Sequence, residues 1–313
     1  MPIIMPTSRD DVLHPTGTNP AREIEEGVRQ KSRIFHMDQF IFRQVAGLEL
    51  LVSPILEARG FVNAFTTRRG GVSPLPAAAL NLGNFSQDDH SNIIENRRRL
   101  KVALELNDRP LLTLQQIHSA DIHWVVNEQD IAVVAATPPV GDALVAAPGE
   151  TLLAVQTADC LPILIADRRT GATAVVHAGW RGTLAGIVSR TVRAMRERLA
   201  CRPEDLLVAI GPAIGPCCFE VGPEVLARFR EVWSHTEQLV SNPQPDGRVH
   251  LDLSLANRLQ LHDAGLAADS IQDCRLCTIC NNNMFFSYRA EKGAANPVGR
   301  LMGVIGWRGN NDQ

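Results

Sequence analysis

The stretch Thr151–Gly182, TLLAVQTADCLPILIADRRTGATAVVHAGWRG, decides how the middle of this chain folds. It contains two apolar runs of the kind that is typical of buried strands. Each run delivers one soft metal ligand: Cys160 in an Ala-Asp-Cys turn, and His177 directly after the run Ala172–Val176. A third candidate ligand, His118, lies upstream. Strand ends beside polar or glycine-rich turns are positions where a site is assembled from distant parts of a chain.

His118, Cys160 and His177 are the kind of ligand set that a catalytic zinc ion uses. Catalytic zinc keeps three protein ligands and leaves a fourth position for water or substrate, whereas structural zinc usually has four protein ligands. Bound zinc lowers the pKa of water from about 15.7 towards about 7. A lone buried Cys or His is more often part of an ordinary core, and spacing alone leaves that alternative open. We predict that these three residues hold one zinc ion with an open coordination position.

Composition restricts the class of partner. The chain has 313 residues, of which 45 % are apolar, a formal net charge of -3 and a pI near 6.3. Because there is no excess of basic residues to neutralise phosphates, neither nucleic acid nor an anionic membrane is an expected partner. We expect a small-molecule substrate, and the sequence does not indicate an oligomeric state.

Targeting signals and cysteine usage point to the cytoplasm. No window approaches the roughly 18–20 apolar residues that a membrane helix needs. Met1–Asp11 reaches charged residues too early for the apolar core of a signal peptide. The seven cysteines are an odd number, so a complete intrachain disulfide framework is impossible, which favours metal-binding or free-thiol roles.

The chain divides into a predicted extension and a predicted domain. Residues 1–37 carry four prolines among mixed charges and show no sustained period of 2 or 3.6. We predict that they form a disordered N-terminal extension, and that residues 38–313 form a single catalytic domain.

Strands and helices alternate along the predicted domain. The expected strands are Leu48–Ser53, Phe61–Thr66, Leu111–Ile117, Ile122–Val126, Ala143–Ala147, Thr151–Gln156, Ala172–Val176, Leu206–Ile210, an aromatic strand within Cys274–Arg289, and Leu301–Trp307. The expected helices are His90–Leu106, a helix with apolar positions from Leu184 to Leu199, Val221–Val232 and Leu253–Ala264. Because these elements do not follow a strict βαβ rhythm, we predict an α+β (mixed α/β) fold rather than a doubly wound sheet.

Several motifs carry a resemblance to a known family. The most specific are Gln-Ile-His-Ser at 116–119, Gly-Asp-Ala-Leu-Val at 141–145, Thr-Ala-Asp-Cys-Leu-Pro at 157–162 and Val-His-Ala-Gly-Trp-Arg-Gly at 176–182. Further matches occur at 67–72, 81–83, 211–221 and 285–289. On these motifs the chain resembles the laccase-domain family, also called the YfiH-like or polyphenol oxidase family and now described as purine nucleoside phosphorylases. The resemblance spans roughly residues 48–306.

The resemblance implies a fold, a metal and a reaction. It implies a compact sandwich with helices packed outside two β layers, and zinc bound at His118, Cys160 and His177. It also implies phosphorolysis of adenosine, guanosine, inosine and methylthioadenosine, with deaminase activity on adenosine. Some relatives resemble peptidoglycan-editing amidases, and older naming treats the family as copper polyphenol oxidases.

Physical chemistry separates these alternatives. A multicopper oxidase needs many imidazoles, typically in His-x-His pairs, and this chain has nine His and no such pair. Cu(II) can nevertheless occupy a Cys/His site, because it outcompetes Zn(II) in the Irving–Williams order. An activated water serves both the deaminase and the amidase alternative. The chain lacks the signature of cytidine-type deaminases, so a deaminase here would be built differently.

Phosphorolysis requires an anion-binding pocket. Arg68 in the loop Thr67–Pro74, Arg181, and the helix N-terminus expected after Gly182 are the candidates for a phosphate site. The alternative for both arginines is a surface position or a salt bridge. The basic run Arg97–Arg99 is interpreted as a solvated helix face.

Other polar residues complete the predicted site. Asp142 and Asp159 flank the metal ligands, where they would orient them or move a proton, unless they only shape turns. Asn81, Gln116 and Tyr288 are candidates for hydrogen bonds to the substrate, each with a structural role as the alternative.

The remaining cysteines leave a further class of function open. Cys274, Cys277 and Cys280 have a spacing typical of metal sites, but no fourth ligand is adjacent in the sequence, so we do not predict a second metal there. Cys217 and Cys218 are expected to pack beside the site as thiols. A zinc-binding or redox-responsive regulatory protein without turnover therefore stands as an alternative to an enzyme.

Overall fold

The computed structural model describes residues 40–75, 78–83, 88–293 and 297–308. All of them belong to the compact unit Gln39–Gln313. The extension predicted for residues 1–37 lies outside the described residues. Two six-stranded sheets and a three-stranded sheet make up the β structure of this part of the chain.

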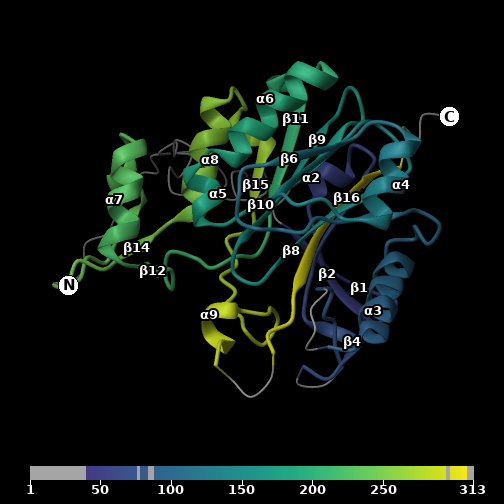
Figure 1. Ribbon diagram of the computed structural model, residues 1–313, viewed down its shortest axis with the longest axis horizontal. Coiled ribbons are helices and arrows are strands. Elements are labelled where there is room, and N and C mark those ends of the chain that lie inside the picture. The colour runs from purple at the N-terminus through teal and green to yellow at the C-terminus, as the bar shows by residue number, and fades with distance from the viewer. Residues whose placement is uncertain (1–39, 76–77, 84–87, 294–296, 309–313) are drawn as a thin grey trace, which may run out of the picture. The chain divides into compact units, whose positions relative to one another are not determined.

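The first sheet contains the last strand of the described chain at its centre (Figure 1). In spatial order its strands are β1 (Ile41–Val45), β2 (Leu48–Val52), β3 (Phe61–Thr66), β16 (Leu301–Trp307), β8 (Leu152–Thr157) and β5 (Leu111–Leu112). Neighbouring strands are antiparallel except β5 and β8, which are parallel.

The second sheet is mostly antiparallel and carries the predicted metal ligands at one end. In spatial order its strands are β15 (Ile271–Asp273), β11 (Leu206–Ile210), β9 (Leu161–Asp167), β10 (Thr173–Ala178), β7 (Ala143–Ala146) and β6 (Ile122–Val125). The two outermost pairs, β15 with β11 and β6 with β7, are parallel. A small separate sheet has the order β12 (Glu220–Val221), β14 (Val249–Leu251) and β13 (Val240–Ser241).

The α-helices are α2 (Pro54–Glu57), α3 (His90–Ala103), α4 (Glu128–Ala136), α5 (Trp180–Leu184), α6 (Ile187–Leu199), α7 (Pro223–Val232), α8 (Leu253–Asp263) and α9 (Tyr288–Glu291). Helices α3, α6 and α8 cover outer faces of the large sheets, whereas α2 and α4 pack against the edges of the layer between them. The 3-10 turns are η2 (Pro203–Asp205), η3 (Thr236–Leu239) and η4 (Ala268–Ser270). A further strand, β4 (Arg69–Ser73), lies beside α3 (Figure 1).

Three apolar layers hold the sheets and helices together. Between the two large sheets, Leu153 and Ile305 of the first pack with Leu164 and Val175 of the second. On the outer face of the second sheet, alternate residues of the same strands pack against α6 and α8. The outer face of the first sheet packs against α3. This period-2 alternation places helices outside two β layers, as the resemblance implied.

Most of the predicted elements are present, and the differences have local causes. The structure confirms the strands Phe61–Thr66, Leu206–Ile210 and Leu301–Trp307 with the predicted bounds. The predicted aromatic strand within Cys274–Arg289 is wrong, because turns follow β15 and Tyr288 begins the short helix α9. Strand β9 and helix α4 have no counterpart in the predicted elements.

The helix predicted beside His177 is interrupted. Its first part, α5, begins at Trp180, and the longer α6 begins only at Ile187. Gly186 separates them with a φ of 74°, which is a left-handed conformation that glycine adopts without strain. Gly182 therefore lies inside a five-residue helix, and the helix N-terminus predicted directly after it is wrong.

Among the described residues, no helix combines the length and the apolar character that crossing a bilayer requires.

We expect Asn96→Ala to lower the free energy of unfolding by about 2–3 kcal/mol. Asn96 is fully buried on α3; it accepts a hydrogen bond from the Val72 amide and donates to Ser73 Oγ and the Asn81 carbonyl. Alanine leaves these partners buried without a hydrogen bond. Urea unfolding followed by circular dichroism measures the change. Ile94→Ala, on the exposed face of the same helix, is the control, and equal losses in both variants would contradict the prediction.

Candidate active site

The predicted ligands His118, Cys160 and His177 come together at one end of the second sheet. His177 lies near the end of β10, opposite Pro162 of β9, so the start of β9 places Cys160 beside it. Their ligand atoms, together with those of His118, all lie within 4.8 Å of one another. The two imidazole rings are 4.9 Å apart between centroids and are inclined at 73°. The arrangement is therefore a cluster of three donors rather than three separate core residues.

Asp142, immediately before β7, holds both histidines. Its carboxylate is fully buried and accepts backbone N–H bonds from Ile117, His118 and Ser119 at 3.2, 2.9 and 2.6 Å. It also lies 2.7 Å from His177 Nδ1. Burial raises the pKa of the Asp142 carboxyl, but hydrogen bonds from His177 and Ser119 outweigh it and lower the pKa to about 2. Asp142 therefore contacts the His118 loop and His177 as a carboxylate with a lowered pKa, and its role in orienting metal ligands stays a prediction.

Electrostatic coupling shifts the protonation of the ligands. Burial raises the pKa of the Cys160 thiol, but the positive charge of His177 and hydrogen bonding from His118 and His177 lower it to about 6. Burial lowers the pKa of His177, and the Cys160 thiolate and Asp142 raise it to about 9. Each of the two groups therefore favours the charged form of the other. The thiolate is the form in which cysteine binds a metal.

Two backbone features keep the ligands close together. His118 has a φ of 63°, which is unusual for a residue other than glycine, and the three amide bonds to Asp142 hold its loop in that conformation. Gly179 provides space on the other side, because a Cβ there would lie 3.0 Å from Cys160 Sγ and 2.9 Å from His118 Cδ2. A larger residue at position 179 would push the ligands apart.

Asp159 braces the turn that carries Cys160. Its side chain is buried, its φ is 95°, and its carboxylate accepts hydrogen bonds from Thr278 Oγ1 and the Arg289 amide, both at 2.6 Å. The turn is thus tied to Thr278 and to helix α9. Because both carboxylate oxygens accept these hydrogen bonds, the Asp159 side chain fixes the shape of the cavity wall.

The ligand cluster opens into a cavity of about 940 Å³. This volume lies within the range of small-molecule sites, roughly 300–1,000 Å³. Of the residues predicted from the sequence, His118, Cys160, His177, Asp159, Gln116 and Tyr288 line it. The Gln116 side chain is paired with the Gln156 backbone, whereas Tyr288 is 54 % exposed at the cavity wall.

Arg68 does not line the cavity. Its guanidinium is paired with Glu291 at 3.1 Å, donates to the Asn282 carbonyl, and lies 4.4 Å from the centre of the Phe286 ring. Glu291 in turn accepts hydrogen bonds from Asn282 and from the Ser287 amide before α9. The structure therefore gives Arg68 the salt bridge that was its alternative, and its anion-binding role stays a prediction.

Arg181 and Asn81 also lie outside the lining of the cavity. Arg181 is exposed and stacks on Trp180, 4.3 Å from the ring centre. Asn81 is fully buried, and its Oδ1 accepts the Arg300 amide at 2.9 Å. Asn81 thus contacts the backbone next to the cavity instead of presenting its amide to a substrate.

Sequence reasoning missed three arginines that line the cavity: Arg97, Arg289 and Arg300. Arg97 donates to the Leu82 carbonyl and is partly buried, so the interpretation of this residue as part of a solvated face is wrong. Arg300 precedes β16, whose first residue pairs with Thr157 at the end of β8. This pairing brings Arg300 to the turn that carries Cys160. The motif match around Arg289 was the only signal in the sequence for any of the three.

The donor set fits a soft or borderline metal ion. One thiolate and two imidazoles suit zinc, and they also suit copper. The Asp142 bond to His177 Nδ1 leaves Nε2 for a metal, which is the usual arrangement of a metal-binding histidine. Three donors facing a cavity leave room for a further ligand.

Comparisons with known proteins find a matching family model and named relatives. The family model described as multi-copper polyphenol oxidoreductase laccase matches residues 62–308. The chain is 40 % identical over 264 residues to a purine nucleoside phosphorylase of Deinococcus radiodurans, covering 83 % of this chain and 93 % of that protein. It is 35 % identical over 237 residues to adenosine deaminase RL5 from an unknown prokaryotic organism, covering 73 % and 88 %.

A solved relative has the same fold. The chain is 38 % identical over 255 residues to purine nucleoside phosphorylase YlmD of Geobacillus stearothermophilus, covering 80 % of this chain and 91 % of that protein. The crystal structure of that YlmD matches with a TM-score of 0.78 and covers 86 % of this chain and 100 % of its own. These matches confirm the predicted α+β sandwich.

We expect Asp142→Asn to weaken the zinc affinity that depends on Cys160 by about 10- to 100-fold. The amide of asparagine offers one acceptor oxygen where the carboxylate now serves three N–H groups and His177. Competition with a chromogenic zinc chelator measures the affinity. The zinc binding that is lost in Cys160→Ala is the part that depends on Cys160. Asp121→Asn, at an exposed position in the same loop, is the control. Unchanged affinity in Asp142→Asn would refute the positioning role.

Proposed function

Because this chain belongs to the multi-copper polyphenol oxidoreductase laccase family, we propose that it is a zinc-dependent purine nucleoside phosphorylase. The substrates proposed are adenosine, guanosine, inosine and methylthioadenosine, with adenosine deamination as a second activity. Relatives named purine nucleoside phosphorylase or adenosine deaminase support an enzyme of this family with a small-molecule substrate.

The observation that carries the proposal is a single cavity that joins a metal-binding triad to arginine side chains. Cys160 lines the same cavity as Arg289 and Arg300. Burial is the largest influence on the Arg300 guanidinium and lowers its pKa. The charges of Cys160, Tyr288 and Asp159 act in the opposite direction and raise it. Phosphorolysis requires both an anion site and electrostatic stabilisation of the reacting sugar, and this cavity offers groups for both.

The metal would be held by His118, Cys160 and His177. A zinc ion held there supplies Lewis acidity, by which metal sites polarise an oxygen or activate water. Asp142 keeps the Nδ1 proton on His177 and so presents Nε2 towards the other ligands. Asp159 fixes the turn on which Cys160 lies.

The arginines and aromatic residues would bind the two substrates. Phosphate oxygens accept hydrogen bonds from guanidinium groups, and Arg289 and Arg300 are the nearest candidates in the cavity. Trp180, Phe219 and Tyr288 present aromatic faces on which a purine ring can stack. In phosphorolysis the bond from the sugar C1′ to the purine N9 breaks, a phosphate oxygen bonds to C1′, and the leaving purine takes up a proton. Tyr288 lines the cavity with an exposed side chain, and we assign its hydroxyl a substrate hydrogen bond.

Arg68 and Asn81 would act through their neighbours. Arg68 holds Glu291, which anchors the start of α9 and with it Tyr288. Asn81 holds the Arg300 backbone. Arg68 and Asn81 would therefore position residues of the cavity wall and would not contact the substrate themselves.

Deamination is the second candidate activity, and similarity to adenosine deaminase RL5 favours it. In this reaction water would replace phosphate as the nucleophile, in the same cavity and at the same triad. Multicopper chemistry fits the residues poorly, because the only histidine-containing metal group among the described residues has just two histidines. An amidase acting on peptidoglycan precursors would use the same triad, and none of the relatives described above carries that name.

We also propose a cytoplasmic enzyme. All seven cysteines are free thiols, which suits a reducing compartment.

We predict that the purified protein converts adenosine to adenine and ribose 1-phosphate, and only when phosphate is present. Cys160→Ala should lower this product to background, because the ligand set is incomplete. Chromatography of the products with and without phosphate checks both statements. Inosine formed without phosphate would support deamination alone. Neither product, from a zinc-loaded and folded protein, would refute the purine assignment and favour muramyl amides as substrates.

The anion site is testable with matched arginine variants. We expect Arg300→Lys and Arg289→Lys to raise the KM for phosphate by about 10-fold or more, since lysine keeps the charge but lacks the planar fork of donors. Arg68→Lys should change it less, because Arg68 faces Glu291. Initial rates against phosphate concentration provide the comparison. A selective effect of Arg68→Lys would instead support the site predicted from the sequence.

A further inference from the structure

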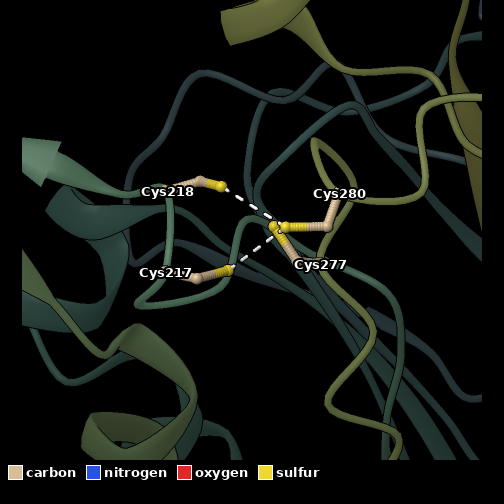
Figure 2. A group of neighbouring side chains, drawn as sticks. All are labelled: Cys217, Cys218, Cys277 and Cys280. Atoms are coloured by element: carbon tan, nitrogen blue, oxygen red, sulfur yellow. Dashed lines mark hydrogen bonds between the residues drawn. The ribbon is translucent and has the colours of Figure 1, made fainter.

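Four cysteines outside the cavity converge at a second place in the fold. Cys217 and Cys218 lie on the loop between β11 and β12, and Cys277 and Cys280 follow β15. Figure 2 shows their sulfur atoms directed towards one another from the two loops. All four sulfur atoms lie within 4.8 Å of one another. Cys274 is not part of this group, although its spacing from Cys277 suggested a metal motif.

The sulfur separations match a metal site better than disulfides. Cys280 Sγ lies 3.5 Å from Cys217 Sγ and 3.5 Å from Cys218 Sγ. A disulfide bond is about 2.05 Å long. Four thiolates at about 2.3 Å from a tetrahedral zinc ion are separated by about 3.8 Å along each edge. These two separations are therefore close to the edge length of such a tetrahedron, and all four sulfur atoms lie within 4.8 Å of one another.

Backbone pairing holds the two loops at this distance. The Ala213 amide donates to the Leu276 carbonyl at 3.2 Å, and the Thr278 amide donates to the Ala213 carbonyl at 2.9 Å. These bonds form a short parallel bridge between Ala213 and Cys277. In the loop that carries Cys217 and Cys218, the amides of Cys218 and Phe219 both donate to the Gly215 carbonyl. These two hydrogen bonds close the turn that contains the two adjacent cysteines.

Gly215 leaves the space that the cluster occupies. A Cβ at this position would lie 3.2 Å from Cys277 Cβ and 3.3 Å from Cys217 Sγ.

We propose that Cys217, Cys218, Cys277 and Cys280 together bind one structural zinc ion. Four cysteines fill the tetrahedral coordination of zinc, so this site differs from the three-ligand cavity site. Thiolates select soft or borderline metals, of which zinc is not redox-active. Apolar burial does not explain the cluster, since Cys277 is buried but Cys217 and Cys280 are exposed.

The zinc ion joins two loops that support the cavity wall. Beside Cys217, the Ile214 amide donates to the Asp159 carbonyl at 2.8 Å. Beside Cys277, Thr278 donates to the Asp159 carboxylate at 2.6 Å. A metal crosslink between the loops therefore stabilises both contacts to the turn that carries Cys160. This role is independent of the reaction proposed above.

The first test counts zinc in variants of the full chain. Protein is produced with added zinc and purified under reducing conditions without chelators, and its metals are measured by mass spectrometry. Cys160→Ala should retain one zinc per chain, and its zinc-edge X-ray absorption should show four sulfur neighbours at about 2.3 Å. Adding Cys217→Ser and Cys280→Ser to Cys160→Ala should remove that zinc. Cys274→Ser in the same background is the matched control and should retain it.

A second measurement uses the unaltered chain, so that a variant that fails to fold cannot decide the outcome. Alkylation followed by peptide mapping compares the zinc-loaded protein with the same protein after chelation. Cys217, Cys218, Cys277 and Cys280 should be protected by zinc as a group, whereas Cys201 and Cys274 should react equally in both samples.

Several outcomes would overturn the proposal. In the metal analysis, these are Cys160→Ala protein that contains no zinc, a zinc content that the two serine substitutions leave unchanged, or iron with acid-labile sulfide in place of zinc. Disulfides among the four cysteines under reducing conditions would also overturn it. So would equal alkylation of the four cysteines with and without zinc.

Discussion

The buried carboxylate of Asp142 holds two of the three candidate metal ligands at once. A buried charge is costly unless it is paired and hydrogen-bonded, and this one is satisfied by three amides of the His118 loop and by His177. The loop consequently adopts a conformation that is unfavourable for His118, and the imidazole of His177 is held in one orientation. The geometry of the site thus depends on satisfying one anion, before any metal or substrate is considered.

The sandwich brings the rest of the site to this carboxylate. Strand β8 belongs to the first sheet and β9 to the second, so the turn that carries Asp159 and Cys160 crosses from one sheet to the other. Strand β16 begins its pairing with β8 beside the same turn, and Arg300 directly precedes β16. Arg289 is attached to Asp159 through its amide. The cavity is therefore lined by residues from both sheets, while Arg68 and Asn81 support that lining from behind.

Sequence reasoning was most successful where the information is local. Apolar alternation located most strands, and the turns that follow them indicated the ligands that the structure brings together. It was less successful where a position depends on distant contacts. Arg97, Arg289 and Arg300 reach the cavity from three segments. The cysteine spacing in the sequence suggested Cys274 as a partner of Cys277, whereas the fold supplies Cys217 and Cys218 from a loop about 60 residues earlier in the chain. Gly186 divides a helix that periodicity alone shows as continuous.

The central place of β16 in the first sheet has a consequence for how the protein is made. Its neighbours β3 and β8 are translated long before Leu301–Trp307, and neither pairs directly with the other. Until that segment leaves the ribosome, both strands present unpaired edges to any chain nearby. Pairing over such sequence distances is slow, and exposed edges favour aggregation. The first sheet can thus become continuous only after β16 has been synthesised.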